Sequence, residues 1–493
     1  MRLTKLLRDV PVEEIIFQGK SYERDIYNIC IDSRKNPQNG LFVCLSGGNA
    51  DGHLFAQEAV KKGALAVVCE RKLDVDVPQI LVKDTRASLS LFAAAFYGFP
   101  SERLKIVGVT GTNGKTTTAH MLAAILNGCG KKTGVIGTLG IFYGDKIESS
   151  ALTTPDPIEL QEIFAKMLAS GMEYAVMEVS AHALYYKKLS GVRFAAGIFT
   201  NFTQDHLDFF PNMQAYKAAK RKFFDKEICP IAIINGDEET GREIGSLREL
   251  NKEKTVYYGL HSPADAFAIV TDETLCGSEC VFNVNDKLCR VGIGMLGKHN
   301  VYNALAATTC AIELGMDIEK VAQALKSFQG VNGRLQRVAT YKGADIFVDF
   351  AHTPDGLEKS LKALGAHCKN RLICLFGCGG NRDRAKRPLM GETVAKLCRF
   401  AVLTSDNPRF EDPLDIISDI ERGYRRFSMK YVVVPDRQTA ISYALDYVKK
   451  GDVLLIAGKG GERYQEIMGI KYAFNDNDII EKMIKEKEKL PSI

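Results

Sequence analysis

The sequence predicts an α/β protein with three domains, two of which contain parallel sheets covered by helices on both faces. Three observations lead to this prediction. The chain has 493 residues, and a domain averages about 150 residues. Short apolar segments typical of strands alternate with helical segments, which is characteristic of parallel sheets. Turn residues interrupt the periodic segments near residues 97–105 and 328–337, so we expect domains at 1–98, 99–332 and 333–493.

The first domain is expected to be the smaller one, with a mixture of strands and a helix. LFVCLSG (41–47) and ALAVVCE (64–70) are typical of buried strands. LFAQEAVKKG (54–63) has the spacing of an amphipathic helix that ends at a glycine.

The middle domain begins with the apolar strand LKIVGVT (104–110), followed by a glycine-rich turn and the helix TTTAHMLAAILNGCG (116–130). YAVMEVS (174–180) and FAAGIFTNF (194–202) predict further buried strands. Residues 255–297 contain short alternating segments without helices, which predicts an antiparallel hairpin insert.

The last domain repeats the alternation of strands and helices, which predicts a second doubly wound, Rossmann-like unit. Its helices are expected at 353–364 and 439–451, and Thr353 and Pro354 suit the N-cap and first position of the former. Its strands are expected at IFVDF (346–350), LICLFG (372–377), FAVLTS (400–405), YVVVPD (431–436) and DVLLIAG (452–458).

Composition indicates a soluble globular protein and excludes several other classes. Apolar residues make up 46% and charged residues 25% of the chain, and its net charge is only +5. So small an excess gives no support for a nucleic-acid or membrane-surface partner. The first residues lack the apolar core of a signal peptide, and no segment reaches the roughly 20 apolar residues of a membrane helix. We therefore expect a cytoplasmic protein without membrane insertion.

The cysteines indicate buried, reduced thiols rather than disulfides or a zinc site. There are 13 of them, an odd number, and most lie in apolar segments typical of strands. Cys276, Cys280 and Cys289 form the tightest group, but their spacing matches no common zinc finger. We expect them on a β-hairpin.

A phosphate-binding loop is the strongest local motif. GVTGTNGKTT (108–117) follows a strand and opens a helix, which is the context of a P-loop. The helix N-terminus favours anions, Lys115 can reach phosphate oxygens, and the Thr116 hydroxyl can bind Mg²⁺. Val109 occupies the first glycine position of the strict pattern. The motif predicts nucleotide binding and no particular reaction.

A series of further motifs, in fixed order, resembles the Mur ligases of peptidoglycan synthesis. After GTNGKTT come MEVSAHAL, TNFTQDHLDFF, AYKAAKRKFF, GKHNVYNALAA, GRLQRV, DFAHTPD, GCGGNRDRAKRPLM, SDNPR and AGKGGE. The amino-terminal IDSRKNPQNGLFVCLSGGNADGH narrows the resemblance to the MurE type, which adds the third amino acid. The resemblance covers nearly the whole chain.

The resemblance implies an ATP-dependent ligase with an acyl-phosphate intermediate. Its substrates would be UDP-MurNAc-L-Ala-D-Glu, ATP and meso-diaminopimelate, and the chain would act as a monomer. ATP contacts are implied at Gly111, Thr112, Asn113, Gly114, Lys115, Thr116, Thr117, Asn300, Asn303, Arg334 and Asp349. Binding of the UDP-MurNAc-peptide is implied at Ile31, Ser33, Gly48, Asn49, Ala50, Thr153, Thr154, Ser180, Tyr186 and Lys188.

The resemblance also implies a magnesium site at Thr116, Glu178, His206 and a carbamoylated Lys220, with Lys115, Glu178, His206 and Lys220 as the catalytic set. From the pattern alone, Lys220 belongs to an ordinary solvated helical charge run with Lys217, Arg221 and Lys222. Carbamoylation needs a neutral amine, and therefore a lysine with a lowered pKa.

The DNPR form of SDNPR resembles diaminopimelate-adding relatives. Diaminopimelate contacts are implied at Arg382, Asp406, Asn407, Pro408, Arg409, Gly458 and Glu462. Arg409 can grip the distal carboxylate that L-lysine lacks. If L-lysine left Arg409 buried without an anion, the cost would be about 2–5 kcal/mol, roughly 30-fold or more in selectivity.

Several positions depart from the family pattern. Gly461 stands where a histidine is usual, and Leu152 where an asparagine is common. Tyr186 and Lys188 stand where glutamine and arginine are frequent. Three alternatives stay open: the same ligase with L-lysine, a folylpolyglutamate synthase-like ligase, and a nucleotide-binding scaffold without ligase activity. The IDSR segment argues against the second, and the presence of Lys115, Glu178, His206 and Lys220 argues against the third.

Overall fold

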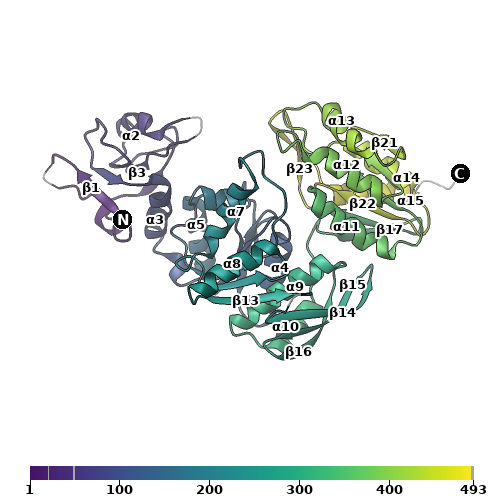
Figure 1. The fold of residues 1–493 in the computed structure, drawn as a ribbon. Helices are drawn as coiled ribbons and strands as arrows, with labels where there is room; N and C mark the ends of the chain where they lie inside the picture. Colours follow the sequence, from purple (N-terminus) through teal and green to yellow (C-terminus); the bar gives the residue numbers. More distant parts are fainter. Residues whose placement is uncertain (20, 48–49, 262, 490–493) are drawn as a thin grey trace.

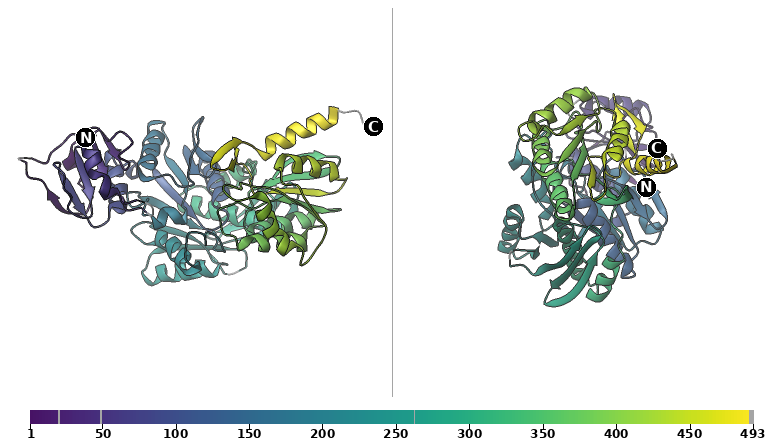
Figure 2. Two further views of the ribbon diagram at one scale, coloured as in Figure 1. Left: turned by 90° about the horizontal axis from the view of Figure 1, so that it is seen from above. Right: turned by 90° about the vertical axis from the view of Figure 1, so that its right-hand side faces the viewer.

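The computed structural model describes residues 1–19, 21–47, 50–261 and 263–489, and it contains three successive α/β units (Figures 1 and 2). The amino-terminal unit lies at one end, the middle unit in the centre and the carboxyl-terminal unit at the other end. The predicted α/β class is confirmed, with sheets that are mostly parallel. None of the helices in the described ranges has both the length and the apolar character needed to cross a membrane.

The amino-terminal unit contains a five-stranded sheet in the order β1-β5-β4-β3-β2. The helix expected over 54–63 is present, but it begins as a 3-10 turn because the Asp51 side chain accepts a hydrogen bond from the His53 N–H. The elements are α1 (Leu3–Leu6), β1 (Val12–Ile16), β2 (Asn28–Cys30), β3 (Gly40–Val43), η1 (Gly52–Phe55), α2 (Ala56–Lys61), β4 (Ala66–Cys69), β5 (Gln79–Val82) and α3 (Thr85–Phe96).

The middle unit is built on an eleven-stranded sheet in the order β16-β15-β14-β13-β12-β11-β6-β10-β7-β8-β9. Its strands are β6 (Lys105–Thr110), β7 (Thr133–Gly137), β8 (Gly140–Tyr143), β9 (Lys146–Glu148), β10 (Tyr174–Glu178), β11 (Phe194–Phe199), β12 (Ile231–Asn235), β13 (Lys254–Gly259), β14 (Ala266–Thr274), β15 (Gly277–Val284) and β16 (Lys287–Ile293). Its helices are η2 (Pro100–Glu102), α4 (Lys115–Gly128), α5 (Pro157–Ala169), α6 (Ala181–Tyr185), α7 (Met213–Arg221), η3 (Lys222–Phe224), α8 (Glu239–Leu250), α9 (Lys298–Glu313) and α10 (Ile318–Lys326).

The expectation of a separate antiparallel insert at 255–297 was wrong in part. β13 pairs in parallel with β12, and β14 pairs in parallel with β13. Only β14, β15 and β16 pair antiparallel, and they extend the edge of the same sheet. The alternation of buried and exposed side chains along a strand shows how far each face of the sheet is covered. It does not show whether the adjacent strand runs parallel or antiparallel, so the pattern could not predict the pairing of β13 and β14.

The three cysteines of this region lie on antiparallel strands and a turn, as expected, but Cys276 is exposed rather than buried. Cys280 and Cys289 lie on the β15–β16 hairpin, and Cys276 lies in the turn before it. Among the described residues, no three His, Cys, Asp or Glu side chains form a group that could hold a metal ion.

The carboxyl-terminal unit has a six-stranded sheet in the order β17-β18-β22-β19-β20-β21, and a separate hairpin of β23 and β24. Thr353 caps α11 as predicted, by accepting a hydrogen bond from the Gly356 N–H. The elements are β17 (Gln336–Tyr341), β18 (Ala344–Asp349), α11 (Pro354–His367), β19 (Leu372–Phe376), α12 (Lys386–Leu397), β20 (Phe400–Leu403), α13 (Pro413–Tyr424), β21 (Tyr431–Val433), α14 (Arg437–Tyr447), β22 (Val453–Ala457), β23 (Tyr464–Ile467), β24 (Ile470–Ala473) and α15 (Asp476–Lys489).

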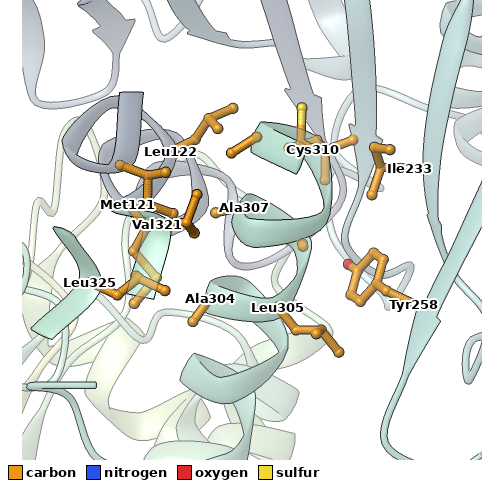
Figure 3. Packing of buried hydrophobic residues seen from close by; sticks show 14 of the residues in the cluster. Met121, Leu122, Ile233, Tyr258, Ala304, Leu305, Ala307, Cys310, Val321 and Leu325 are labelled. Carbon is orange, nitrogen blue, oxygen red and sulfur yellow. The ribbon is translucent and has the colours of Figure 1, made fainter. Parts of the chain in front are cut away.

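The largest apolar cluster of the middle unit fixes α4, the helix that follows the glycine-rich loop. Met121 and Leu122 of α4 pack among side chains of α9 and α10, including Ala307 and Leu325 (Figure 3). Complete burial of one such large apolar side chain contributes about 1.5–3 kcal/mol. The position of the loop is therefore set by a core on the far side of α4.

We predict that loss of the buried pair between Arg437 and Asp476 destabilises the carboxyl-terminal unit. The two side chains are fully buried and make a two-point contact, with Nε–Oδ1 2.8 Å and Nη2–Oδ2 2.7 Å. Asp476→Ala leaves the guanidinium without its anion, at a cost of about 3–5 kcal/mol. Hydrogen exchange of β22 and α14 measures this loss. Lys487→Ala, which removes a surface pair with Asp446, is the control and should change protection little. Equal protection in the two variants would contradict the prediction.

Candidate active site

The glycine-rich loop joins the carboxyl end of β6 to α4, and two of its glycines are required by geometry. Gly111 has φ +148°, and a Cβ there would lie 1.9 Å from the Thr200 hydroxyl. Gly114 has φ +86° and caps α4. The Asn201 side chain, which follows β11, accepts a hydrogen bond from the Asn113 N–H at 2.8 Å. The loop is therefore held by the end of the neighbouring strand.

Two lysines converge on this loop. Lys115 donates to the carbonyls of Gly111 and Thr112, both at 2.9 Å. Lys220 donates to the same Gly111 carbonyl at 2.7 Å and is only 1% exposed. Burial, and then the positive charge of Lys115, lower the pKa of Lys220 well below its ordinary value. The environment therefore favours the neutral amine.

The pattern-based interpretation of Lys220 as part of a solvated charge run was wrong. Helix α7 buries Tyr216, Ala219 and Lys220, whereas the side chain of Lys217 is 33% exposed and forms an ion pair with Glu243. A charge run does not show which member of the helix faces the protein, because that depends on what packs against the helix.

Glu178, at the end of β10, lies beside the loop and links it to the carboxyl-terminal unit. Its Oε1 accepts hydrogen bonds from the Thr116 hydroxyl at 3.0 Å and from the Thr138 N–H at 2.8 Å. The Thr116 hydroxyl in turn accepts a hydrogen bond from Arg334 Nη2 at 2.8 Å. Arg334 also lies over the Phe350 ring, with its Cζ 4.2 Å from the ring centroid. An arginine from outside the middle sheet therefore reaches the first turn of α4.

His206 lies near the same place, in a backbone conformation with φ +57°. Its ring is 5.0 Å from that of His182, and burial lowers its pKa to about 3. The neighbouring carboxylate of Asp205 faces two groups of the carboxyl-terminal unit, His352 at 3.8 Å and Lys386 at 3.9 Å. Burial lowers the pKa of His352 to about 4, so both rings are neutral near pH 7 and Lys386 is the cation that faces Asp205.

Asn300 and Asn303 lie on α9 behind the loop, where both are buried. Asn303 Oδ1 accepts a hydrogen bond from the Thr118 hydroxyl at 3.2 Å, and Asn300 donates to the Leu296 carbonyl at 2.8 Å. Asp349, at the end of β18, accepts hydrogen bonds from the N–H groups of Leu335 and Phe350. In this arrangement the three side chains support the loop and the segment that carries Arg334.

The residues expected along the sugar-peptide path form a hydrogen-bonded chain that ends at Glu178. The Thr154 hydroxyl donates to the Glu178 carbonyl at 2.8 Å and lies 3.1 Å from the Ser180 hydroxyl. The Thr153 hydroxyl lies 3.1 Å from that of Thr138, which itself contacts the Glu178 carboxylate. These residues are therefore continuous with the phosphate loop.

Three of the residues expected at the nucleotide-sugar end, Ile31, Tyr186 and Lys188, lie at the junction of the amino-terminal and middle units. A small cavity of about 50 Å³ there is lined by Ile31, Leu45, Arg86, Leu89, Asp156, Pro157, Ile158, Tyr186 and Lys188. Ser33 is buried and its hydroxyl is 3.2 Å from Glu58 Oε2. Ala50 is exposed. Gly48 and Asn49 lie outside the described residues.

The residues expected to bind the added amino acid gather at the carboxyl-terminal unit. Asn407 Nδ2 donates to Glu462 Oε2 at 3.0 Å, and Gly458 lies so close to Asp406 that a Cβ would be 2.4 Å from its Oδ2. A Cβ at Gly379 would lie 3.0 Å from Arg409 Nη1 and 3.7 Å from Arg382 Cγ, so the two arginines flank this glycine. Pro408 joins Asn407 to Arg409 in the same segment, and its carbonyl packs against Gly380.

Several residues of this region were missed by the sequence reasoning. Lys459 is fully buried and donates to Asn407 and Glu462, both at 3.0 Å. Arg86 lies over the Tyr186 ring, with its Cζ 4.7 Å from the centroid. Asp205, Lys386 and Glu466 are the other site residues that the sequence reasoning missed. Asp205, Lys386 and Lys459 lie inside the motifs that resemble the family, and this position was the signal that could have identified them. Their interaction partners could not be identified in this way, because those partners are distant in sequence.

The fold and the site define a nucleotide-binding P-loop protein whose last unit reaches the loop. Comparisons with known proteins narrow this class. Family models match residues 25–97 as the catalytic domain of the Mur ligase family, 109–311 as the Mur ligase middle domain and 333–460 as the Mur ligase glutamate ligase domain.

Two curated relatives match almost end to end, and both are named UDP-N-acetylmuramoyl-L-alanyl-D-glutamate–2,6-diaminopimelate ligase. The one from Clostridium acetobutylicum is 42% identical over 491 residues, with 99% of this chain and all of that protein covered. The one from Syntrophomonas wolfei is 40% identical over 495 residues with the same coverage. A solved structure with that name is 31% identical, with a TM-score of 0.69 over 94% of this chain and 96% of the other. The chain belongs to the Mur ligase family.

We predict that Asp205→Asn weakens the approach of the carboxyl-terminal unit to the phosphate loop. The change removes the anion that faces the buried Lys386, and loss of one partner of a buried charge pair is costly. We expect kcat/KM for ATP to fall at least about tenfold, which corresponds to about 1.4 kcal/mol. Steady-state kinetics and small-angle scattering measure the two effects. Asp208→Asn is the matched control, because Asp208 pairs with the half-exposed Arg382 at 3.4 Å. A normal KM for ATP and an unchanged radius of gyration in Asp205→Asn would refute the prediction.

Proposed function

We propose that this protein is an ATP-dependent ligase that adds meso-diaminopimelate to UDP-MurNAc-L-Ala-D-Glu during peptidoglycan synthesis. The observation that carries the proposal is the contact of Arg334 with the Thr116 hydroxyl, which itself bonds to Glu178. This contact joins the nucleotide-binding loop of the middle unit to the carboxyl-terminal unit. The residues expected to bind the added amino acid lie in that unit. Membership of the Mur ligase family, and full-length relatives with this enzyme name, support the same reaction.

ATP would bind with its phosphates at the N-terminus of α4. The loop N–H groups and the helix terminus favour anions there. Lys115 would exchange its hydrogen bonds with the Gly111 and Thr112 carbonyls for phosphate oxygens, and Arg334 would supply a second cation. Asn300, Asn303 and Asp349 would keep the loop and the Arg334 segment in position. Thr112, Asn113, Gly114 and Thr117 would complete the nucleotide contacts.

The reaction would proceed in two steps. A substrate carboxylate oxygen attacks the γ-phosphorus of ATP, the bond to ADP breaks, and an acyl phosphate forms. The neutral amine of the amino acid then attacks the acyl carbon, giving a tetrahedral intermediate that expels phosphate and loses a proton. The first step brings two anions together and the second forms an anionic tetrahedral intermediate, so positioning and cationic side chains are the main requirement on the protein.

The residues of the site fit a magnesium ion and a carbamate on Lys220. Glu178 and the Thr116 hydroxyl supply oxygen, and His206 is neutral near pH 7, as a metal ligand must be. Burial lowers the pKa of Lys220, which favours the neutral amine that reacts with CO₂, and the resulting carbamate would add anionic oxygens. When bound, Mg²⁺ supplies charge neutralisation for the phosphate groups.

The nucleotide sugar and the added amino acid would bind on opposite sides of the phosphate loop. The nucleotide sugar would occupy the junction lined by Ile31, Tyr186 and Lys188, and it would also contact Ser33, Gly48, Asn49 and Ala50 of the amino-terminal unit. Thr153, Thr154 and Ser180 would line the path of the peptide toward Glu178. The amino acid would bind at Arg382, Asp406, Asn407, Pro408, Arg409, Gly458 and Glu462, in a cytoplasmic enzyme that acts as a monomer.

Arg409 already has a counter-ion within the protein. L-Lysine would not leave Arg409 without an anion, because Arg409 Nε lies 3.2 Å from Glu466 Oε2. A preference for diaminopimelate therefore depends on what the distal carboxylate gains at Arg409 and Arg382 in competition with Glu466, and we expect it to be smaller than roughly 30-fold.

We predict that Lys220→Ala lowers kcat sharply and that a short-chain carboxylic acid partly restores it. The variant removes the amine that would carry the carbamate, and a free carboxylate can supply the missing oxygens. Bicarbonate should not rescue it, because no amine remains. Phosphate release with all three substrates measures the effect, and Lys217→Ala, on the exposed side of α7, is the control. Near-normal turnover of Lys220→Ala would refute the carbamate.

We predict that phosphate release from ATP requires UDP-MurNAc-L-Ala-D-Glu together with meso-diaminopimelate, and that L-lysine is the poorer substrate. Arg409→Ala should raise KM for diaminopimelate and leave KM for L-lysine almost unchanged, because only diaminopimelate has the distal carboxylate. Dipeptide-independent release would favour a scaffold, and ligation of glutamate to a folate would favour the folylpolyglutamate synthase alternative. A preference for L-lysine would favour the lysine-adding ligase.

A further inference from the structure

We propose that Glu466 is a positioning residue that sets how strictly the enzyme selects a distal carboxylate, because it is an internal counter-ion of Arg409. The inference rests on the function proposed above and concerns the same amino-acid site. Glu466 lies outside the motifs that identified the family.

The backbone fixes Glu466 and Arg409 side by side. The Arg409 N–H donates to the Glu466 carbonyl at 3.0 Å, and the Met468 N–H donates to the Arg409 carbonyl at 2.7 Å. These bonds join the segment that carries Arg409 to strand β23 and its turn. Arg409 has φ +52°, an unusual conformation for an arginine, which this pairing holds in place.

The guanidinium is already partly used by the protein. Its Nε donates to Glu466 Oε2 at 3.2 Å, and its Nη1 donates to the Gly380 carbonyl at 2.7 Å. Nη2 has no hydrogen-bond partner within the described part of the chain. A distal carboxylate would therefore bind mainly through Nη2, with the edge that contains Nε taken by Glu466.

Burial strengthens the competition between Glu466 and a substrate carboxylate for the Arg409 guanidinium. The side chains of Arg409 and Glu466 are only 19% and 22% exposed, so solvent screens their interaction less than that of a surface pair. A substrate carboxylate on the same guanidinium would be repelled by the Glu466 carboxylate. An amino acid without that carboxylate would leave Arg409 with its counter-ion. Both effects reduce discrimination against L-lysine.

The backbone of Glu466 also supports the neighbouring part of the site. Its N–H donates to Asn407 Oδ1 at 2.9 Å, and the same oxygen accepts a hydrogen bond from Lys459 at 3.0 Å. A substitution of the Glu466 side chain leaves these main-chain contacts available. Its effect can therefore be assigned to charge rather than to loss of Asn407.

The test compares kcat/KM for meso-diaminopimelate and L-lysine in Glu466→Gln, which keeps size and removes charge. We expect the ratio to rise about fivefold, which corresponds to about 1 kcal/mol. The rise should come from a lower KM for diaminopimelate and a higher KM for L-lysine, with KM for ATP unchanged. Glu466→Asp keeps the charge and should stay close to the wild type.

Glu421→Gln is the matched control, because Glu421 lies on α13, is 19% exposed and pairs with Arg425, the residue that follows this helix. An unchanged or lower ratio of the two kcat/KM values in a folded Glu466→Gln variant would overturn the inference about Glu466. If the wild type still ligates the amino acid, the proposed function would remain supported. If that variant does not fold, Glu466→Thr, which suits a strand, is the second neutral variant and must show the same rise. A wild type that ligates neither amino acid would instead refute the proposed function.

Discussion

Parallel pairing of β6 with β10 and β11 is the constraint on which the rest of the site depends. Because the three strands run in one direction, their carboxyl ends meet at one edge of the sheet. The phosphate loop follows β6, Glu178 ends β10, and the segment of Thr200 to His206 follows β11. One hydrogen-bonding ladder therefore brings the glycine-rich backbone, a carboxylate and a histidine together.

The carboxyl-terminal unit adds the charges that this edge lacks. Arg334 bonds to Thr116, and Asn113 Nδ2 donates to Asp355 Oδ2 at 3.0 Å across the same boundary. Lys386 faces the buried Asp205 a short distance away. Each contact couples the approach of the last unit to the phosphate loop, so the position of this unit and the completeness of the site are linked.

The two halves of the site differ in how they manage charge. Around the phosphate loop, Lys115 and Arg334 contact carbonyls and a hydroxyl rather than carboxylates, so positive charge remains available for anionic ligands. Around the residues expected to bind the added amino acid, Lys459 pairs with Glu462, and Arg409 pairs with Glu466. Charges there are compensated within the protein, so a charged ligand would have to compete with existing ion pairs.

The sequence by itself determined the α/β class, the P-loop and its helix, and the order of motifs that indicates the family. Those features depend on local periodicity, on glycines with required backbone angles, and on capping residues such as Thr353, all of which act over a few neighbouring residues. Only the tertiary structure decided that Lys220, and not Lys217, is buried, and that β14 to β16 continue the central sheet. The tertiary structure also revealed that Glu466 lies beside Arg409, although the two residues are 57 positions apart in the chain. Burial, strand neighbours and counter-ions depend on groups that are distant in sequence, and the pattern of a single segment contains no information about what packs against it.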